Sequence, residues 1–427
     1  MPPRQCTKTK SNAAKSSNQI RIPISREDYA EMMNNHQHFR AKLDQFIERY
    51  PELFPVNIEQ GYQLYGLARA SVKMPDIKRQ RIRLNTADVQ GQHHIYTIVP
   101  SFVLPYMAGT TDEVEHALFL RRFGVPFWAL THIFGHNDMY WQRLVAQFGS
   151  NDIVGTTVKD PALLPEHLLA DEKHTRLNGE KAYIATTVAR DCVLGISIAP
   201  AADEPALTEA YGQFKKETHR LNPDYHPQTV NTDGWSATQL AWGALFPTIV
   251  IIQCFLHAFI TIRSRCKRLK DLFPEIRQRV WDIYHTNQLE HFRDNISELG
   301  DWATQHLTGR PLDAVLKLCA KTELFTLSFD HPHAHRTSNM IDRHLDPLAR
   351  CLYSAHYFHG HLMSAESQLR AWALFHNFQP YCPRAQITER FQSPFHKLNG
   401  FLYHDNWLQN LLVASSLGGC NAPNSIR

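Results

Sequence analysis

The chain has 427 residues, 43% of them hydrophobic and 11% aromatic, which is enough to bury a substantial core and excludes a disordered protein. Its formal net charge is only +4, so overall charge does not by itself indicate a nucleic-acid-binding protein. The cysteines are scattered singly, with no Cys-x-x-Cys pair and no secretory signal, which predicts a reducing cytosol.

The N-terminal quarter combines a basic segment with a mixed α+β pattern. Residues 1–25 contain five cations and no acid, and we predict a basic flexible tail there. In the following region, residues 26–110, apolar spacing predicts a helix from residue 26 to about residue 55 and strands at 78–84 and 94–103. A group of cations around the first of these strands is compatible with a solvated face or with a phosphate-facing surface: Lys73, Lys78, Arg79, Arg81 and Arg83.

Residues 111–155 predict three short helices separated by glycines. The first helix begins at a Thr/Asp cap, breaks occur at Gly124 and near Gly135, and Asn137 caps the third helix. This is the outline of a helix-turn-helix region, whose last helix would enter the major groove of DNA. The alternative is a small three-helix packing unit without DNA contacts. The candidate DNA-binding residues are Asn137, Tyr140, Gln142 and Arg143.

From Leu163 the pattern changes to strands. Turn signals at Asn178-Gly179 and Arg190-Asp191 divide three strands into an antiparallel meander. A helix, a fourth strand that ends at Asp233, a second helix and a buried strand, TIVIIQC, follow in that order. Alternating charge and apolar residues at helical spacing then predict a helical insertion over residues 259–329.

One uncharged segment, Leu240–Ile262, is just long enough to cross a bilayer. Pro247, Gln253 and His257 interrupt it, and its centre is β-branched like a buried parallel strand. We therefore expect a strand followed by an amphipathic helix, and no membrane contact.

Three aspartates are the candidate catalytic and metal-binding residues. Asp171 and Asp233 are placed at the ends of the first and fourth predicted strands, and Asp342 is placed on a later helix. A lone aspartate at a strand end is usually a turn or cap residue, but these three fall where they could converge. Converging carboxylates can hold two divalent ions such as Mg²⁺, which promote phosphodiester cleavage by activating the attacking oxygen and stabilising the departing one.

The motifs around these acids resemble a known family. LLADEKHT, GEKAYIATTVA, VLGISIAP, NTDGW, IVIIQCFLHAF, HRTSNMIDR, HGH and RAWALFHNFQPYCP follow one another as in bacterial insertion-sequence transposases of the DDE/DDD type, related to the Mutator-like group. The resemblance covers about residues 163–383. It implies that Asp171, Asp233 and Asp342 are the catalytic acids and bind two Mg²⁺ or Mn²⁺ ions. Cys254 and His257 resemble the Cys-x-x-His element that such enzymes carry after the second acid.

The implied fold class is α/β, with a ribonuclease H-like mixed five-stranded sheet, a helical insertion and a preceding α-helical helix-turn-helix region. The expected catalytic domain is formed by residues 160–258 and 330–385, and residues 386–427 are expected to be a C-terminal tail. The third acid is usually Glu in this family, so Glu366 remains an alternative to Asp342. Further candidate DNA contacts are Arg263, Arg265, Lys267 and Arg343.

The resemblance implies a DNA transposase that hydrolyses phosphodiesters at transposon ends and transfers the 3′-OH into target DNA. Its partners would be terminal inverted repeats and target DNA, bound by a homo-oligomer in the bacterial cytoplasm at the nucleoid. Two alternatives stay open: a decayed or domesticated transposase that only binds DNA, and a metal-dependent nuclease that cuts without strand transfer. All three acids are present, which disfavours the first alternative.

Overall fold

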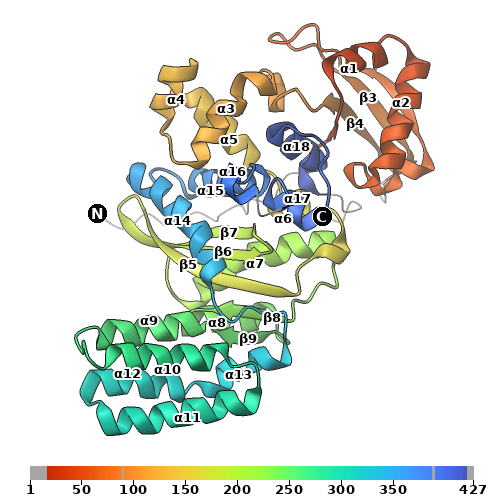
Figure 1. Ribbon diagram of the computed structural model, residues 1–427. Helices are drawn as coiled ribbons and strands as arrows, with labels where there is room; N and C mark the ends of the chain where they lie inside the picture. The colour runs from red at the N-terminus through yellow and green to blue at the C-terminus, as the bar shows by residue number, and fades with distance from the viewer. Residues whose placement is uncertain (1–16, 89–90, 387–389, 421–427) are drawn as a thin grey trace, which may run out of the picture. The chain divides into compact units, whose positions relative to one another are not determined.

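The computed structural model describes residues 17–88, 91–386 and 390–420. The chain divides into two compact units, each built from separate stretches of sequence. Unit 1 contains residues 1–163, 220–223 and 358–427, and unit 2 contains residues 164–219 and 224–357. Figure 1 shows the elements of both units, which are described separately below.

A four-stranded sheet opens unit 1, with the strand order β1-β4-β3-β2. Strand β1 runs parallel to β4, and the other neighbours are antiparallel. The strands are β1 (Gln19–Ile22), β2 (Tyr62–Leu67), β3 (Gln80–Ala87) and β4 (His93–Pro100). The helices that accompany them are α1 (Arg26–Met32) and α2 (His36–Arg49), with 3₁₀ turns η1 (Pro51–Leu53), η2 (Val56–Gln60) and η3 (Pro105–Met107).

Two expectations for this region are wrong. The segment to residue 25 was expected to be a tail, yet within its described part β1 is a strand whose Ile20 and Ile22 are fully buried. These two residues point to the same side because strand side chains alternate. The single helix expected over residues 26–55 is two helices, because Asn35 begins α2 by accepting a hydrogen bond from the Gln37 amide. Residues 1–16 lie outside the described part of the chain.

The three helices expected in residues 111–155 are present as α3 (Thr111–Arg122), α4 (Phe127–Phe134) and α5 (Asp138–Phe148). Thr110 and Glu113 form a capping box at the start of α3, and the Asn137 side chain accepts from the Tyr140 amide at the start of α5. Gly124 and Gly135 separate the helices with positive φ angles. A fourth short helix, α6 (Ile153–Thr157), follows.

The central helix of unit 1 is α15 (Leu362–Phe378), which packs against α3, α5, α6, α17 and α18. Every residue from Ala371 to Phe378 is buried. The expected catalytic segment 330–385 is therefore wrong beyond residue 357, because α15 belongs to unit 1. The second half of α15 is buried on all sides and so needs partners all round, which helices from both ends of unit 1 supply.

The expected C-terminal tail, 386–427, is also wrong in its described part. Helices α17 (Pro394–Asn399) and α18 (Trp407–Ala414) and the turn η5 (Ser416–Gly419) bury most of their side chains in unit 1. A short helix, α16 (Pro383–Gln386), precedes them. The apolar run from Trp407 to Ala414 explains the result, since a segment this apolar stabilises the fold by leaving water.

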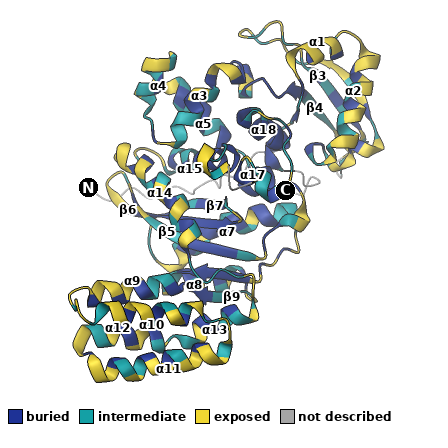
Figure 2. Cartoon of the chain, viewed as in Figure 1, coloured by how far each residue is buried: buried dark blue, intermediate teal, exposed yellow. Residues whose placement is uncertain are grey.

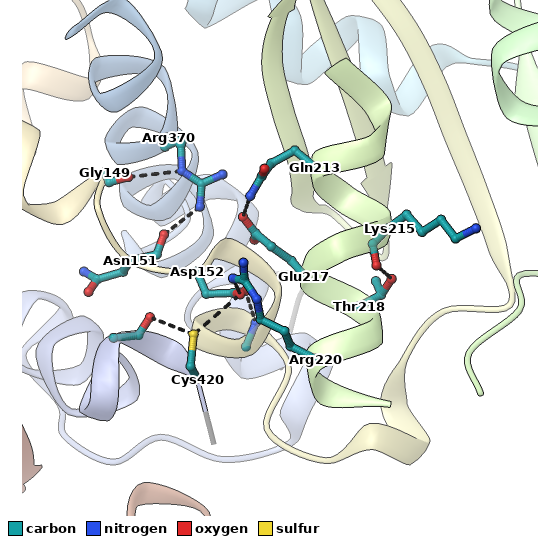
Figure 3. A network of polar contacts seen from close by, with 12 residues as sticks. Gly149, Asn151, Asp152, Gln213, Lys215, Glu217, Thr218, Arg220, Arg370 and Cys420 are labelled. Atoms are coloured by element: carbon teal, nitrogen blue, oxygen red, sulfur yellow. Dashed lines mark hydrogen bonds and ion pairs between the residues drawn. The ribbon is translucent and has the colours of Figure 1, made fainter. Parts of the chain in front are cut away.

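A polar network joins distant stretches of unit 1 (Figure 3). The Arg370 guanidinium donates to the carbonyl oxygens of Gly149 at 3.1 Å and Asn151 at 2.7 Å. Asp152, almost fully buried, caps α6 and forms an ion pair with Arg220 at 2.9 Å. Buried charges need such partners, because unpaired ones cost several kcal/mol, on the order of 3 or more. This pairing explains why the short stretch 220–223 belongs to unit 1.

Unit 2 contains the expected mixed five-stranded sheet, with the order β7-β6-β5-β8-β9. Strands β5, β6 and β7 form the antiparallel meander, and β8 and β9 run parallel to β5. The strands are β5 (His167–Leu177), β6 (Glu180–Ala189), β7 (Cys192–Ala199), β8 (Thr229–Thr232) and β9 (Val250–Gln253), preceded in the chain by η4 (Pro161–Leu163). The predicted order of strands and helices is confirmed for this unit.

Helices α7 (Glu204–Leu221) and α8 (Ser236–Leu245) pack together beside the sheet. The rings of Phe214 and Trp242 lie 6.0 Å apart, and Trp242 stacks on Phe246 at 5.7 Å. Phe214 also lies directly against Gly195 of β7, where a larger residue would not fit. On the opposite face, β5 and β6 are contacted by α14 (Asn339–Ser354).

The helical insertion is present as a bundle of five helices among the described residues. They are α9 (Phe255–Cys266), α10 (Phe273–His285), α11 (Leu289–His306), α12 (Gly309–Cys319) and α13 (Thr322–Asp330). Figure 2 shows buried stripes along these helices, and those residues form one apolar cluster. The segment 240–262 is split between α8, β9 and α9. In the described residues, no helix has the length and apolar character needed to cross a membrane.

Candidate active site

Asp171 lies inside β5 rather than at its end, which corrects the expectation from sequence. It is the fifth of the eleven residues of β5 and pairs with Thr186 of β6. The residues of β5 after Asp171 are mostly polar, but the strand continues through them because β6 pairs with it as far as Leu177. Pairing with β8 ends earlier, at Leu169, so Asp171 lies just beyond the last residue that β8 covers.

Asp233 directly follows β8, as expected. Its Oδ1 accepts a hydrogen bond from the Trp235 amide at 2.8 Å, which fixes the turn into α8. Gly234 has a φ of +94°, and a Cβ there would lie 2.6 Å from Nε2 of Gln253. The turn therefore requires glycine both for its backbone angle and for the close approach of the Gln253 side chain.

Asp342 lies in the first turn of α14, which packs against β5 and β6. Side chains alternate along a strand, so Asp171 and Lys173 share one face of β5. Electrostatic interactions of Asp342 with both Lys173 and Asp171 show that this is the face that α14 covers. The fold thus brings the third aspartate to the first, although they are far apart in the sequence.

The three aspartates share one electrostatic environment. Burial, followed by the charges of Asp233 and Asp342, raises the pKa of Asp171 to about 6 against the opposing effects of the Glu172 amide and His257. Burial also raises the pKa of Asp342, partly offset by His257 and by a hydrogen bond from Ser338. Burial and neighbouring negative charges thus favour the protonated forms of Asp171 and Asp342.

Cys254, His257 and Ser338 form a second polar group beside the acids. The Cys254 Sγ lies 3.3 Å from the Ser338 Oγ and accepts from the Ser338 amide at 3.2 Å, and the Ser338 Oγ lies 3.3 Å from Nδ1 of His257. The hydrogen bond to Cys254, together with the charges of Cys254, Asp171 and Asp233, raises the pKa of His257 to about 9 despite burial, which opposes the shift. Burial opposes ionisation of the Cys254 thiol, but hydrogen bonds from His257 and Ser338 outweigh it and lower its pKa.

Glu172 and Ser338 are the site residues that sequence reasoning missed. Glu172 points to the face opposite Asp171, and its Oε1 accepts from Tyr211 of α7 and Thr238 of α8, each at 2.7 Å. Burial raises the pKa of Glu172 to about 7 despite these hydrogen bonds. The one signal in the sequence is a second acid directly after Asp171, which strand alternation places on the opposite face, next to Ala170. Ser338 carried no signal, because its partners lie in a distant part of the chain.

The residues suit a hard divalent cation by their chemistry. Three carboxylates offer oxygen ligands, and burial together with neighbouring charges disfavours the ionised forms of Asp171 and Asp342. The oxygen atoms Asn231 Oδ1, Thr232 Oγ1 and Gln253 Oε1, at the ends of β8 and β9, are buried without hydrogen-bond partners among the described residues. Within the described ranges, however, no three His, Cys, Asp or Glu side chains are spaced as ligands of one ion.

The candidate DNA contacts fall into separate parts of the chain. In unit 1, Asn137, Tyr140 and Arg143 line a surface cavity of about 350 Å³ together with Lys73 and Tyr106. Gln142 is only partly exposed, and its carbonyl oxygen accepts from Gln368 of α15.

In unit 2, the remaining candidate cations are all exposed. Arg263 and Arg265 lie in the last turn of α9, Lys267 follows that turn, and Arg343 follows Asp342 on α14. Of these four, Arg343 is the one that neighbours an aspartate of the cluster in sequence.

Glu366, the alternative third acid, lies on α15 in unit 1, whereas the three aspartates all lie in unit 2. Asp342 is the later acid that interacts electrostatically with Asp171. Compared with known proteins, the chain matches no protein-family model and no curated protein.

Proposed function

We propose that this chain is a DNA transposase of the DDE/DDD type with a ribonuclease H-like catalytic domain. The observation that carries the proposal is the electrostatic cluster of Asp171, Asp233 and Asp342, on β5, after β8 and on α14. The sheet supports it as well, because three antiparallel strands followed by two parallel ones is the arrangement expected for that domain. The resemblance of the motifs around these acids to insertion-sequence transposases is the third support.

Asp171, Asp233 and Asp342 would hold a pair of Mg²⁺ or Mn²⁺ ions. When bound, such ions activate the attacking oxygen and stabilise the leaving oxygen of a phosphodiester. The protein would contribute the fixed positions of the carboxylates: β-sheet pairing for Asp171, the Trp235 amide for Asp233 and the Ser338 hydroxyl for Asp342. Fixed ligands reduce the reorganisation needed when charge develops in the reaction.

DNA recognition in this proposal falls to α3, α4 and α5, with α5 as the helix that would enter the major groove. Asn137 and Arg143 line the cavity at the start of α5, where an exposed guanidinium suits a phosphate or a base edge. Near the acids, Arg343 is an exposed cation beside Asp342 and suits the phosphate of the substrate strand.

The test is a cleavage and strand-transfer assay with the full chain. Labelled duplexes carrying the DNA that flanks the coding region are incubated with a supercoiled target plasmid and Mg²⁺. We expect 3′-OH cleavage products and joined products, both abolished in Asp233→Asn. The matched control is Asp224→Asn, which removes one carboxylate from the loop before β8 and is expected to leave activity intact.

Each other outcome has a distinct meaning. Cleavage without joining in the same assay would replace the proposal by a metal-dependent nuclease. Binding of the flanking DNA without cleavage, at any concentration of Mg²⁺ or Mn²⁺, would replace it by a non-catalytic DNA-binding protein. Activity that persists in Asp233→Asn would show that the aspartate cluster is not the active site.

A further inference from the structure

At β2 and β3, the four-stranded sheet of unit 1 has one buried face and one partly exposed face, which we call the open face. Side chains alternate along β3, so Ile82 and Leu84 are buried while Arg81 and Arg83 point the other way. On the covered side, Tyr62 of β2 donates from its hydroxyl to Asp44 of α2 at 2.8 Å. On the open side, Tyr65 is 41% exposed beside the two arginines.

The open face presents a cation–aromatic cluster, which we define as Tyr65, Arg81 and Arg83. Both guanidinium groups lie over the Tyr65 ring, 5.2 Å from its centre for Arg81 and 5.3 Å for Arg83. Arg83 also donates to Oε1 of Gln63 at 2.8 Å, across the register pair that joins β2 to β3. The ring and the amide therefore hold two arginines side by side without neutralising either of them.

Positive charge strongly predominates in the sequence around the cluster. Between residues 61 and 87 the only acid is Asp76. In the part of the chain that the structure describes, none of the cations of this stretch has a carboxylate within ion-pair distance. These cations are Arg69, Lys73, Lys78, Arg79, Arg81 and Arg83. Cations kept ordered but unpaired are suited to a polyanion, because neutralising phosphates releases condensed counterions.

The loop between β2 and β3 extends this charge toward the candidate helix-turn-helix region. Lys73, in that loop, lines the same cavity as Asn137 and Arg143 of the α5 region. Tyr106, on the rim of this cavity, is 79% exposed and has a φ of +56°, an uncommon angle for a tyrosine. A duplex held at α5 thus has a run of unpaired cations beside it within unit 1.

We propose that the open face of β2 and β3 is a second DNA-binding surface, which grips the phosphate backbone of a duplex through Arg81 and Arg83 with Tyr65 as their support. The partner class rests on the proposed function, but the surface is distinct from α5 and from the aspartate cluster. Backbone contacts of this kind add affinity without reading sequence, so the surface serves any duplex.

The test measures binding of the full chain to a random-sequence duplex by fluorescence anisotropy over a range of salt concentrations. We expect Arg81→Gln/Arg83→Gln to weaken binding at low salt and to reduce the slope of log Kd against log salt by roughly 2, one unit for each lost phosphate contact. The variant and the wild type then differ by about tenfold more at 50 mM salt than at 200 mM.

Two further variants separate a specific contact from lost charge. Arg310→Gln/Lys317→Gln removes the same charge from α12 and is expected to leave the slope unchanged. Tyr65→Phe keeps the ring under both guanidiniums and is expected to bind like wild type, whereas Tyr65→Ala is expected to show an intermediate loss. Circular dichroism checks that each variant is folded.

The outcomes distinguish this surface from the proposed function. An unchanged slope in Arg81→Gln/Arg83→Gln, or an equal loss in the α12 variant, overturns the surface and leaves the cleavage assay to decide the activity. Binding by the wild type that depends on the two arginines supports the surface even if no cleavage is seen. A wild-type chain that binds no duplex, or binds only RNA, overturns the surface.

Discussion

The Sγ atom of Cys254 accepts a hydrogen bond from the backbone amide of Ser338, at 3.2 Å. Cys254 begins the helical insertion and Ser338 lies where the chain returns from it, just before α14. A second bond between the same stretches runs from the Phe255 amide to the Arg336 carbonyl at 3.1 Å, and Asn231 donates to His335 at 2.8 Å. These bonds hold residues 335–338 against the ends of β8 and β9. They therefore fix the position at which α14, the helix that carries Asp342, begins.

Removing the sulfur should therefore destabilise the start of α14. In Cys254→Ala the Ser338 amide, which is almost fully buried, loses its acceptor, at a cost of about 1–3 kcal/mol. Cys254→Ser keeps an acceptor and should lose less. Urea denaturation followed by tryptophan fluorescence measures the difference. Cys382→Ala, at an exposed cysteine, is the control and should stay within about 0.5 kcal/mol of wild type. Equal losses in the Ala and Ser variants would show that the sulfur is not an anchor.

The identity of the third acid can be tested within one set of variants. Asp342→Asn should slow DNA cleavage at least about a hundredfold, the effect of losing roughly 3 kcal/mol of transition-state stabilisation. Glu366→Gln should cleave normally, because Asp342, and not Glu366, is among the charges that act on Asp171. Asp346→Asn, one helical turn beyond Asp342 and exposed, controls for the loss of charge from α14. The reverse pattern, with Glu366→Gln inactive and Asp342→Asn active, would make Glu366 the third acid.

Glu172 predicts a specific dependence of stability on pH. The folded carboxyl has a pKa of about 7 against an ordinary value of 4.5, so the folded state holds the proton more tightly than the unfolded state does. Its contribution to stability is therefore present below about pH 4.5, declines as pH rises, and is lost above about pH 7.

Glu172→Gln should remove this decline and keep an oxygen acceptor for Tyr211 or Thr238. We expect the variant to be more stable than wild type at pH 8 by roughly 1–3 kcal/mol and close to it near pH 4.5. Denaturation at several pH values measures this. The control is Glu180→Gln, at an exposed position on β6, which should follow the wild-type curve. A Glu172→Gln curve parallel to that of wild type would contradict the raised pKa.

Gly234 and Gly243 form a matched pair for testing the turn after Asp233. Alanine at Gly234 must adopt a φ of +94° and push against Gln253, which should cost about 1–3 kcal/mol and move the Asp233 carboxylate. Gly243 lies inside α8 with open space around it, so Gly243→Ala should be neutral or stabilise by up to about 1 kcal/mol. Thermal unfolding and the cleavage assay together report both effects. A Gly234→Ala variant with wild-type stability and activity would show that the turn is not constrained.

Local patterns predicted unit 2 well, because its sheet follows the chain order of strands and helices. The five strands, the insertion and the break-up of the apolar segment 240–262 were all found where expected. Asp171 was placed at a strand end because the polar residues after it looked like a turn. They are strand residues, paired along their whole length with β6. Polarity alone does not end a strand when a partner continues beside it.

The errors in unit 1 have a different cause, which is the choice of distant partners. The second half of α15, from Ala371 to Phe378, is mostly apolar, which predicts a buried segment but not which core buries it. The same holds for Trp407 and its neighbours in α18. Ser338 and Glu172 belong to the same class of problem, since their roles depend on residues brought to them by the fold rather than on any motif around them.

Because unit 1 is built from separate stretches of sequence, its parts are synthesised at different times. All of unit 2 leaves the ribosome before residues 358–420, which supply α15 and α18 to unit 1. Until then α5 carries Trp141, Leu144 and Phe148, all buried in the finished fold, without the helix that packs against them. Unit 2 has its complete sequence available for folding during translation, whereas unit 1 must wait for residues 358–420. A chain that stopped after residue 357 would therefore contain Asp171, Asp233 and Asp342 in unit 2 but lack the helices that complete unit 1.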